Sequence, residues 1–302
     1  MFKDKVASAL FIILISFTSV LSAQNRFAES SKELLNRDSK KVFVIAHRGD
    51  WRNAPENSLQ AIKNVIEMGV DIVEIDIKMT KDKQLIVMHD KALDRTTNGK
   101  GLVSDYNLSD IQNLYLRNGA GAVTEHRIPT LEEALRLCKG QIWINIDKGY
   151  EYMAEVYDLL EKTGTTNQVI LKSGTGYEEL LSKYKNILNK IVYMPIIDLN
   201  SKDAQTQIKK FADYKPVAIE CVFSEENTDV IDLIAQIRKN GSKVWINSLW
   251  ASLCAGRHDD KAVEQNKEDE TWGWMLDQGV KMIQTDRPKE LLLYLKNKGL
   301  HE

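Results

Sequence analysis

Two histidines and two carboxylates lie close together in the first third of the chain, in positions suited to chemistry. His47 and His89 each follow a short apolar run directly, and Glu74 and Asp76 lie between them, two residues apart. An imidazole titrates near neutrality, so one histidine can accept a proton while the other donates one. With a cation held by the carboxylates, this group suits the cleavage of a phosphate ester.

The two carboxylates belong to a β-branched run, which predicts a strand. Alternate residues of a strand share a face, so Glu74 and Asp76 project together, opposite their apolar neighbours. Two adjacent negative charges are costly to bury unless a cation accompanies them, and Ca²⁺ or Mg²⁺ suits such oxygen ligands. A surface strand with two solvated acids is the alternative. Asp147 ends another apolar run and is a candidate third ligand, or else a helix cap.

Arginine and glutamate residues near the first histidine extend this site. Arg48 follows His47 directly, and its guanidinium could hold two phosphate oxygens through a bidentate contact. Glu56 either orients Arg48 or joins the metal ligands. Asn57 precedes a helical pattern and is interpreted as its cap.

Short apolar runs alternate with amphipathic stretches from residue 41 to the end, which predicts one α/β domain over residues 41–302. The runs are Val42–Ala46, Ile72–Ile77, Gln84–Met88, Ile142–Ile146, Val169–Leu171, Ile191–Ile197, Val217–Val222, Val244–Ile246 and Met282–Gln284. Repeated strand and helix units of this kind predict a (β/α)8 TIM barrel, with a doubly wound open sheet as the alternative. The third run is expected to pair with the second. Ala92–Arg127, rich in Gly and Asn, is expected to be a small insertion after the second strand.

The N-terminal residues do not fit the barrel pattern. Residues 1–23 combine Lys3 and Lys5, an apolar stretch and small residues before Gln24, as a signal peptide does. An uncleaved anchor is the alternative. Cleavage predicts a secreted or periplasmic protein with no stable membrane insertion, in which residues 24–40 form a lead-in to the domain.

The composition of the chain limits the classes of ligand and partner that we expect it to bind. The 302 residues carry a formal net charge of -2, so no overall basic charge indicates nucleic-acid binding. The three cysteines, Cys138, Cys221 and Cys254, lie far apart, and their spacing indicates neither a zinc site nor a disulfide framework.

Several of these residues form a set that resembles a known family. His47-Arg48-Gly49, Pro55-Glu56-Asn57, Glu74-Ile75-Asp76 and His89-Asp90 are similar in order and spacing to the motifs of glycerophosphodiester phosphodiesterases. Segments around Pro129, Trp245 and Asp286 are also similar, so the resemblance spans about residues 42–296.

The resemblance implies a TIM barrel, a divalent metal, and hydrolysis of a small glycerophosphodiester to glycerol phosphate and an alcohol. By position it implies metal ligation by Glu74, Asp76 and Asp147, acid-base catalysis by His47 and His89, and phosphate binding by Arg48. It does not assign the acid and the base between the two histidines.

The chain departs from the family at the end of the third barrel strand. The family pattern there is Glu-X-Lys, whereas this chain has Asp147-Lys148-Gly149. Alternation would turn Lys148 away from Asp147 unless the strand has already ended, so Lys172 on the next strand is a candidate for the displaced charge. Trp245 is expected to line the substrate pocket, with barrel packing as its alternative role.

The sequence is also compatible with two further functions. One is a phospholipase of the same superfamily that acts on intact lipid, and the other is a noncatalytic barrel that only captures a ligand. Retention of both histidines and all three acids favours catalysis.

Overall fold

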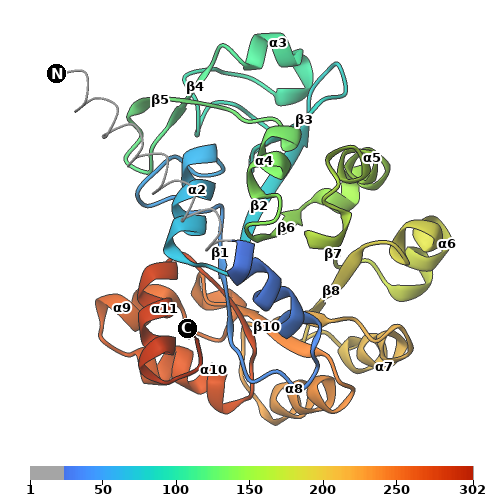
Figure 1. Ribbon diagram of the computed structural model, residues 1–302. Coiled ribbons are helices and arrows are strands. Elements are labelled where there is room, and N and C mark those ends of the chain that lie inside the picture. The colour runs from blue at the N-terminus through green and yellow to red at the C-terminus, as the bar shows by residue number, and fades with distance from the viewer. Residues whose placement is uncertain (1–23, 302) are drawn as a thin grey trace, which may run out of the picture.

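A closed barrel of eight parallel strands forms the body of the molecule (Figure 1). The computed structural model describes residues 24–301. The barrel strands are β1 (Phe43–Ala46), β2 (Ile72–Met79), β6 (Trp143–Asp147), β7 (Val169–Ser173), β8 (Val192–Asp198), β9 (Ala218–Val222), β10 (Lys243–Asn247) and β11 (Met282–Thr285). They are hydrogen-bonded in chain order, and β1 pairs with both β2 and β11, which closes the sheet. The predicted TIM barrel is confirmed.

Helices surround the barrel and connect successive strands. They are α2 (Leu59–Met68), α4 (Leu131–Cys138), α5 (Met153–Thr163), α6 (Tyr177–Leu188), α7 (Ala204–Tyr214), α8 (Thr228–Lys239), α9 (Asp259–Glu264), α10 (Trp274–Asp277) and α11 (Pro288–Asn297). Helix α2 is capped by Ser58, whose hydroxyl accepts the N–H of Ala61 at 3.0 Å. The cap of α2 is therefore Ser58, one residue after the expected Asn57.

Alternation along the strands divides the apolar residues into two cores. Outward residues such as Val73 and Ile75 pack against the helices. Inward residues near the N-terminal ends of the strands fill the barrel: Phe43, Ile45, Ile72, Trp143, Ile170, Met194, Ala218, Trp245 and Met282. Farther along the same strands the inward positions become polar, so the chemistry lies at the C-terminal mouth.

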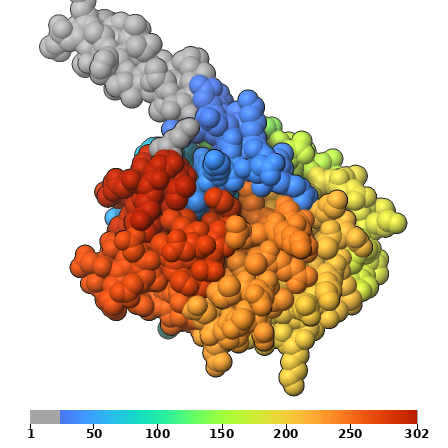
Figure 2. Space-filling model, turned by 90° about the horizontal axis from the view of Figure 1, so that it is seen from below, coloured from blue at the N-terminus to red at the C-terminus, as the bar shows by residue number. Residues whose placement is uncertain are grey.

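A helix over residues 24–35 closes the barrel floor. Leu34 from this helix is fully buried among the inward apolar residues, and Phe27 packs beside it. Figure 1 shows the helix, in blue, crossing in front of the strands, and Figure 2 shows this segment beside the red C-terminal residues. No helix within residues 24–301 is long and apolar enough to cross a membrane. The expected signal peptide, residues 1–23, lies outside the described residues.

The expected insertion after the second barrel strand is a small layer of its own, at the top of Figure 1. It follows β3 (Leu85–Val87) and comprises a short 3-10 helix η1 (Val103–Asp105), α3 (Leu108–Ile111), β4 (Tyr115–Arg117) and β5 (Val123–Arg127). Strand β3 pairs antiparallel with the end of β2, as predicted, and β4 pairs with β5. A separate apolar cluster that includes Leu93, Ile111 and Leu116 holds it together.

Candidate active site

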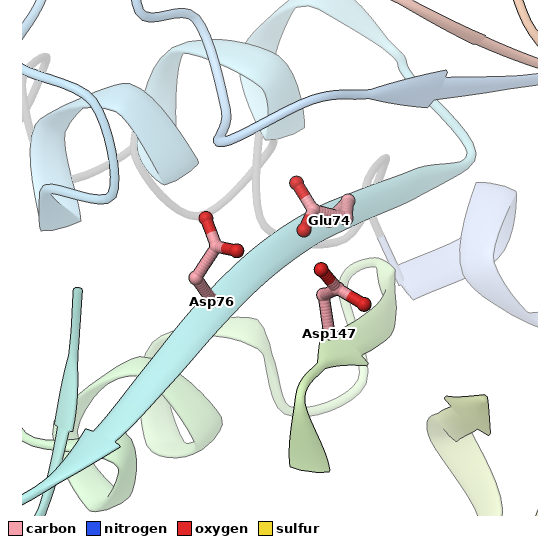
Figure 3. A group of neighbouring side chains, drawn as sticks. All are labelled: Glu74, Asp76 and Asp147. Atoms are coloured by element: carbon pink, nitrogen blue, oxygen red, sulfur yellow. The ribbon is translucent and has the colours of Figure 1, made fainter. Parts of the chain in front are cut away.

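Three carboxylates meet inside the mouth of the barrel (Figure 3). Glu74 and Asp76 project from β2, and Asp147 projects from the end of β6, where it is the register partner of Asp76. One oxygen from each lies within 4.8 Å of the others. Three close carboxylate oxygens are the donors that a hard divalent cation prefers, so the residues fit the implied metal.

The pKa values of Glu74 and Asp76 are shifted in opposite directions. Burial, together with the negative charge of Asp76, raises the pKa of Glu74. Burial would also raise the pKa of Asp76, but Lys148, Arg48 and His89 outweigh it and hold that pKa well below its usual range. Two neighbouring carboxyl groups whose pKa values are shifted in opposite directions repel each other when both are ionised. A bound cation would reduce this repulsion.

Each of the two histidines is held by its own aspartate. His47 Nδ1 lies 2.8 Å from Asp286 Oδ1, and His89 Nδ1 lies 2.6 Å from Asp90 Oδ1. A carboxylate at Nδ1 favours the proton on that nitrogen and leaves Nε2 for proton transfer. Burial alone would lower the pKa of His47, but Asp286 and the charge of Glu74 raise it overall.

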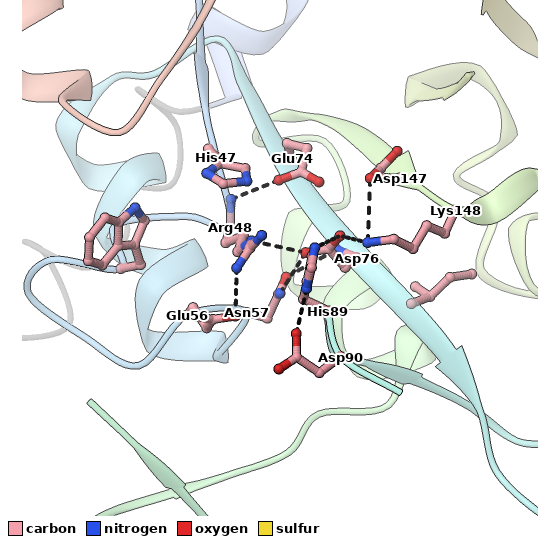
Figure 4. Close-up of polar contacts among 12 residues, drawn as sticks. His47, Arg48, Glu56, Asn57, Glu74, Asp76, His89, Asp90, Asp147 and Lys148 are labelled. Carbon is pink, nitrogen blue, oxygen red and sulfur yellow. Dashed lines mark hydrogen bonds and ion pairs between the residues drawn. The ribbon is translucent and has the colours of Figure 1, made fainter. Parts of the chain in front are cut away.

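The histidines flank the acidic trio as expected (Figure 4). The Nε2 atom of His89 lies 4.0 Å from Asp76 Oδ1. His47 is tied to the trio through the next peptide group, because the backbone N–H of Arg48 donates to Glu74 Oε2 at 2.9 Å. The structure therefore places both imidazoles around the carboxylates.

Arg48 turns back into the site because the chain bends sharply there. Arg48 and Gly49 both have left-handed backbones, with φ of 54° and 74°. The Arg48 guanidinium pairs with Glu56 at 3.0 Å and with Asp76 at 3.3 Å. Glu56 also binds Arg95 from the insertion through both of its oxygens. Two roles were left open for Glu56. Its contacts favour the first, which is to orient Arg48. Glu56 does not belong to the close group of Glu74, Asp76 and Asp147.

Asn57 and Lys148 hold Asp76 from two sides. The Asn57 amide donates to Asp76 Oδ2 at 3.0 Å and accepts the Asp76 backbone N–H at 3.1 Å. Lys148 follows the last residue of β6 and has a left-handed backbone, with φ of 60°. Its Nζ therefore swings back to Asp76 Oδ1 at 2.8 Å and to Asp147 Oδ2 at 3.7 Å. Because the strand has ended, alternation does not turn Lys148 away.

Two residues expected to bind substrate are buried inside the barrel. Lys172 is 5% exposed and donates to Glu220 at 2.8 Å. Burial lowers the pKa of Lys172, but Glu220, Asp147 and Glu74 raise it overall, so the amine stays charged. Trp245 is fully buried in the inward apolar core, with its indole N–H bonded to Asn247. The structure thus gives Trp245 the packing role, and it does not place the ring at the pocket.

A cleft of about 400 Å³ opens beside His47 and Arg48. Its barrel side includes Trp51, Trp250 and Asp286. Its opposite wall comes from the insertion: Arg95, Thr96, Arg117, Asn118, Gly119 and Gly121. A substrate in this cleft would contact both parts of the fold.

Sequence reasoning missed Asp286 as the partner of His47. The two residues are 239 positions apart in the chain. A signal was present, because each is the first residue after one of two strands that pair in parallel, with Ala46 opposite Thr285. Arg95 was also missed, since a single arginine in a loop carries no pattern.

Comparison with known proteins gives two kinds of match. A family model described as a domain of unknown function matches residues 193–295. The chain is 33% identical to the Bacillus subtilis protein named "Putative glycerophosphodiester phosphodiesterase YhdW" over 184 residues, 57% of this chain and 74% of that protein. It is 48% identical over 99 residues to a Caldanaerobacter subterraneus glycerophosphodiester phosphodiesterase, 32% of this chain and 40% of that protein.

Solved structures extend the likeness over nearly the whole described chain. A glycerophosphoryl diester phosphodiesterase from Parabacteroides distasonis matches with a TM-score of 0.74 and 25% identity, covering 90% of this chain and 92% of that one. At this coverage the likeness includes the barrel.

Proposed function

The chain belongs to the glycerophosphodiester phosphodiesterase family, and we propose that it hydrolyses glycerophosphodiesters to glycerol phosphate and an alcohol with the help of a divalent metal. One observation carries this proposal: three carboxylates within 4.8 Å lie between two histidines that are each held by an aspartate. Such a group serves proton transfer at both ends of a phosphodiester bond.

The metal would be held by Glu74, Asp76 and Asp147, the trio that offers close oxygens. When bound, a divalent cation supplies Lewis-acid stabilisation of negative charge on the phosphoryl oxygens. Both Ca²⁺ and Mg²⁺ accept oxygen ligands of this type. Arg48 lies beside the trio and the cleft, where its guanidinium can bind and orient a phosphate group.

His47 and His89 would move the protons. One imidazole takes a proton at Nε2 from the glycerol hydroxyl that attacks phosphorus, and the other gives a proton from Nε2 to the departing alkoxide. Water then opens the resulting cyclic phosphate to glycerol phosphate, with the two histidines in reversed roles. Asp286 and Asp90 keep the rings oriented through Nδ1. Trp51 donates its indole N–H to Asp286 at 2.6 Å and thereby fixes the aspartate itself.

The test is an assay of the purified protein with glycerophosphocholine and other glycerophosphodiesters, after metal removal and with Mg²⁺ or Ca²⁺ added back. We expect glycerol phosphate to form only with metal. His47→Ala and His89→Ala should each lower kcat by roughly 10²-fold or more, because each removes an acid-base group. His126→Ala, on β5 and outside the cleft, is the matched control and should keep full activity.

No turnover of any glycerophosphodiester with either metal would refute the proposal. Turnover of intact phospholipid in preference to its deacylated form would identify a phospholipase instead. Ligand binding without turnover would identify a noncatalytic barrel.

We also propose that residues 1–23 direct export and are removed, which would place the enzyme in a secreted or periplasmic compartment. The basic start, apolar stretch and small residues of this segment support the proposal. Mass spectrometry of the expressed protein should find an N-terminus at Gln24 in the exported fraction. An intact N-terminus on exported protein would contradict cleavage.

A further inference from the structure

The insertion wall of the cleft carries a cation that the proposed mechanism does not use. Arg117 ends β4 and lines the cleft together with His47 and Arg48. Its Nε donates to the carbonyl oxygen of Thr97 at 2.7 Å, and Nη1 donates to that of Gly121 at 2.9 Å. Two backbone acceptors therefore fix the guanidinium plane, while Nη2 has no hydrogen bond within residues 24–301.

The charge of Arg117 is also uncompensated. Arg48 and Arg95, the other arginines of the cleft, share the carboxylate of Glu56. In the part of the chain that the structure describes, no carboxylate oxygen lies within 4.0 Å of the Arg117 guanidinium. A fixed guanidinium without a counter-ion is prepared to bind a carboxylate or a phosphate.

A second polar group on the same wall lacks a partner. Thr96 is 5% exposed and lines the cleft, and its hydroxyl oxygen is buried without a hydrogen bond to any described residue. Thr96 is adjacent to Arg117, because the backbone N–H of Arg117 donates to the Thr96 carbonyl at 2.7 Å. An unpaired buried hydroxyl is costly, so it indicates a group that a ligand would satisfy.

Within residues 24–301, the acidic groups of the cleft offer no free carboxylate to a quaternary ammonium group. The acids of the cleft, Glu56 and Asp286, already accept bonds from arginine, histidine or tryptophan. The guanidinium of Arg52 lies 4.6 Å from the centre of the Trp51 ring, so a cation already occupies one aromatic face. Among the described residues that line the cleft, the charged group without a charged partner is therefore the Arg117 guanidinium.

We propose that Arg117 and Thr96 form a subsite for an anionic group on the alcohol portion of the substrate. The enzyme then prefers glycerophosphodiesters whose alcohol carries a carboxylate or a second phosphate. This inference rests on the proposed function, since it names the substrate class for the same cleft.

Glycerophosphoserine and glycerophosphoethanolamine provide the test, because they differ only by one carboxylate. We expect the wild-type kcat/KM to be about tenfold higher for the serine diester, equivalent to about 1.4 kcal/mol. Arg117→Gln should bring the ratio of the two kcat/KM values close to one. Loosening of the β4–β5 hairpin would lower both values together and leave the ratio unchanged.

Thr96→Val is a second variant that keeps the shape of the side chain and removes the unpaired hydroxyl. It should fold with unchanged or higher Tm and lower the ratio severalfold. Arg127→Gln is the matched control, because Arg127 lies on the same insertion but stacks on Tyr115 outside the cleft. Its ratio should equal that of the wild type.

A wild-type ratio of one or less would overturn the subsite, as would an unchanged ratio in both Arg117→Gln and Thr96→Val. Absence of turnover with these two diesters and with every other glycerophosphodiester, with either metal, would instead overturn the proposed function, and the subsite with it. The two failures are therefore distinguished by whether the wild-type protein hydrolyses either substrate.

Discussion

Asp286 accepts hydrogen bonds from two rings of the site, and its substitution tests how far His47 depends on orientation. In Asp286→Asn the amide oxygen can still accept the Trp51 N–H, but the negative charge beside His47 is lost. We expect kcat to fall by roughly 10²-fold or more, with a smaller change in KM, because the ring loses its preferred tautomer. Steady-state kinetics measure the two parameters. Asp260→Asn, at an exposed acid, should behave as the wild type.

The ion pair of Lys172 and Glu220 inside the barrel predicts an effect on stability. Lys172→Met would leave the Glu220 carboxylate buried without its cation, at a cost of about 3–5 kcal/mol in the free energy of unfolding. Urea denaturation measures this change. The double variant with Glu220→Gln should recover most of the loss, since neither charge then remains. A single variant as stable as the wild type would contradict the buried pair.

The turn between β1 and α2 requires glycine for two reasons. Gly49 has a φ of 74°, and an added Cβ would lie 2.8 Å from the backbone of Ala61 in α2. Gly49→Ala therefore combines backbone strain with displacement of the helix. Gly140 has a similar φ of 68° but open space around it.

We expect Gly140→Ala to cost about 1–2 kcal/mol, the strain of a left-handed alanine, and Gly49→Ala to cost at least twice as much. Chemical denaturation gives both values, and kcat should fall only in Gly49→Ala, which moves Arg48. Equal costs for the two variants would show that the close approach to α2 is relaxed without penalty.

Strand alternation made the elements and the acidic trio predictable, but it has limits at strand ends. Glu74 and Asp76 lie inward as expected because they are within β2. Trp245 shares that inward face on β10, yet it lies two residues below Asn247 and so falls in the apolar layer. Alternation gives the face of a residue, whereas its height along the barrel depends on where the strand begins.

Contacts made after the strands end were not predictable in the same way. Lys148 reaches Asp76 only because its backbone is left-handed, and no residue pattern indicated that conformation. The pairing of His47 with Asp286 depends on closure of the barrel by β1 and β11. Such contacts follow from the three-dimensional register, which a single strand does not contain.

For the whole molecule, Asp71 joins the two ends of the described chain at the barrel floor. Its carboxylate accepts from the Val44 N–H at 2.9 Å, pairs with Lys41 at 2.8 Å, and lies 2.8 Å from His301 Nε2. Ser30 of the N-terminal helix also donates to it. Burial would raise the pKa of Asp71, but His301 and Lys41 lower it overall.

The sign of this shift predicts how stability responds to acid. Because the folded pKa lies below the unfolded value of 3.8, Asp71 stabilises the fold above that pH and loses its contribution as the pH falls through the folded pKa. Asp71→Asn should therefore be less stable than the wild type at neutral pH, and the difference should shrink below about pH 4. Urea denaturation from pH 7 to pH 3 measures it. A difference that stays constant would contradict the lowered pKa.

The separate apolar cluster of the insertion has a consequence for how the enzyme could diversify. Barrel strands supply the acidic trio, whereas the insertion supplies Arg117 and Thr96 on one wall of the cleft. Because the insertion packs around its own residues, residues on its cleft wall can change without repacking the barrel core. Substrate preference can therefore diverge at Arg117 and Thr96 while the acidic trio stays unchanged.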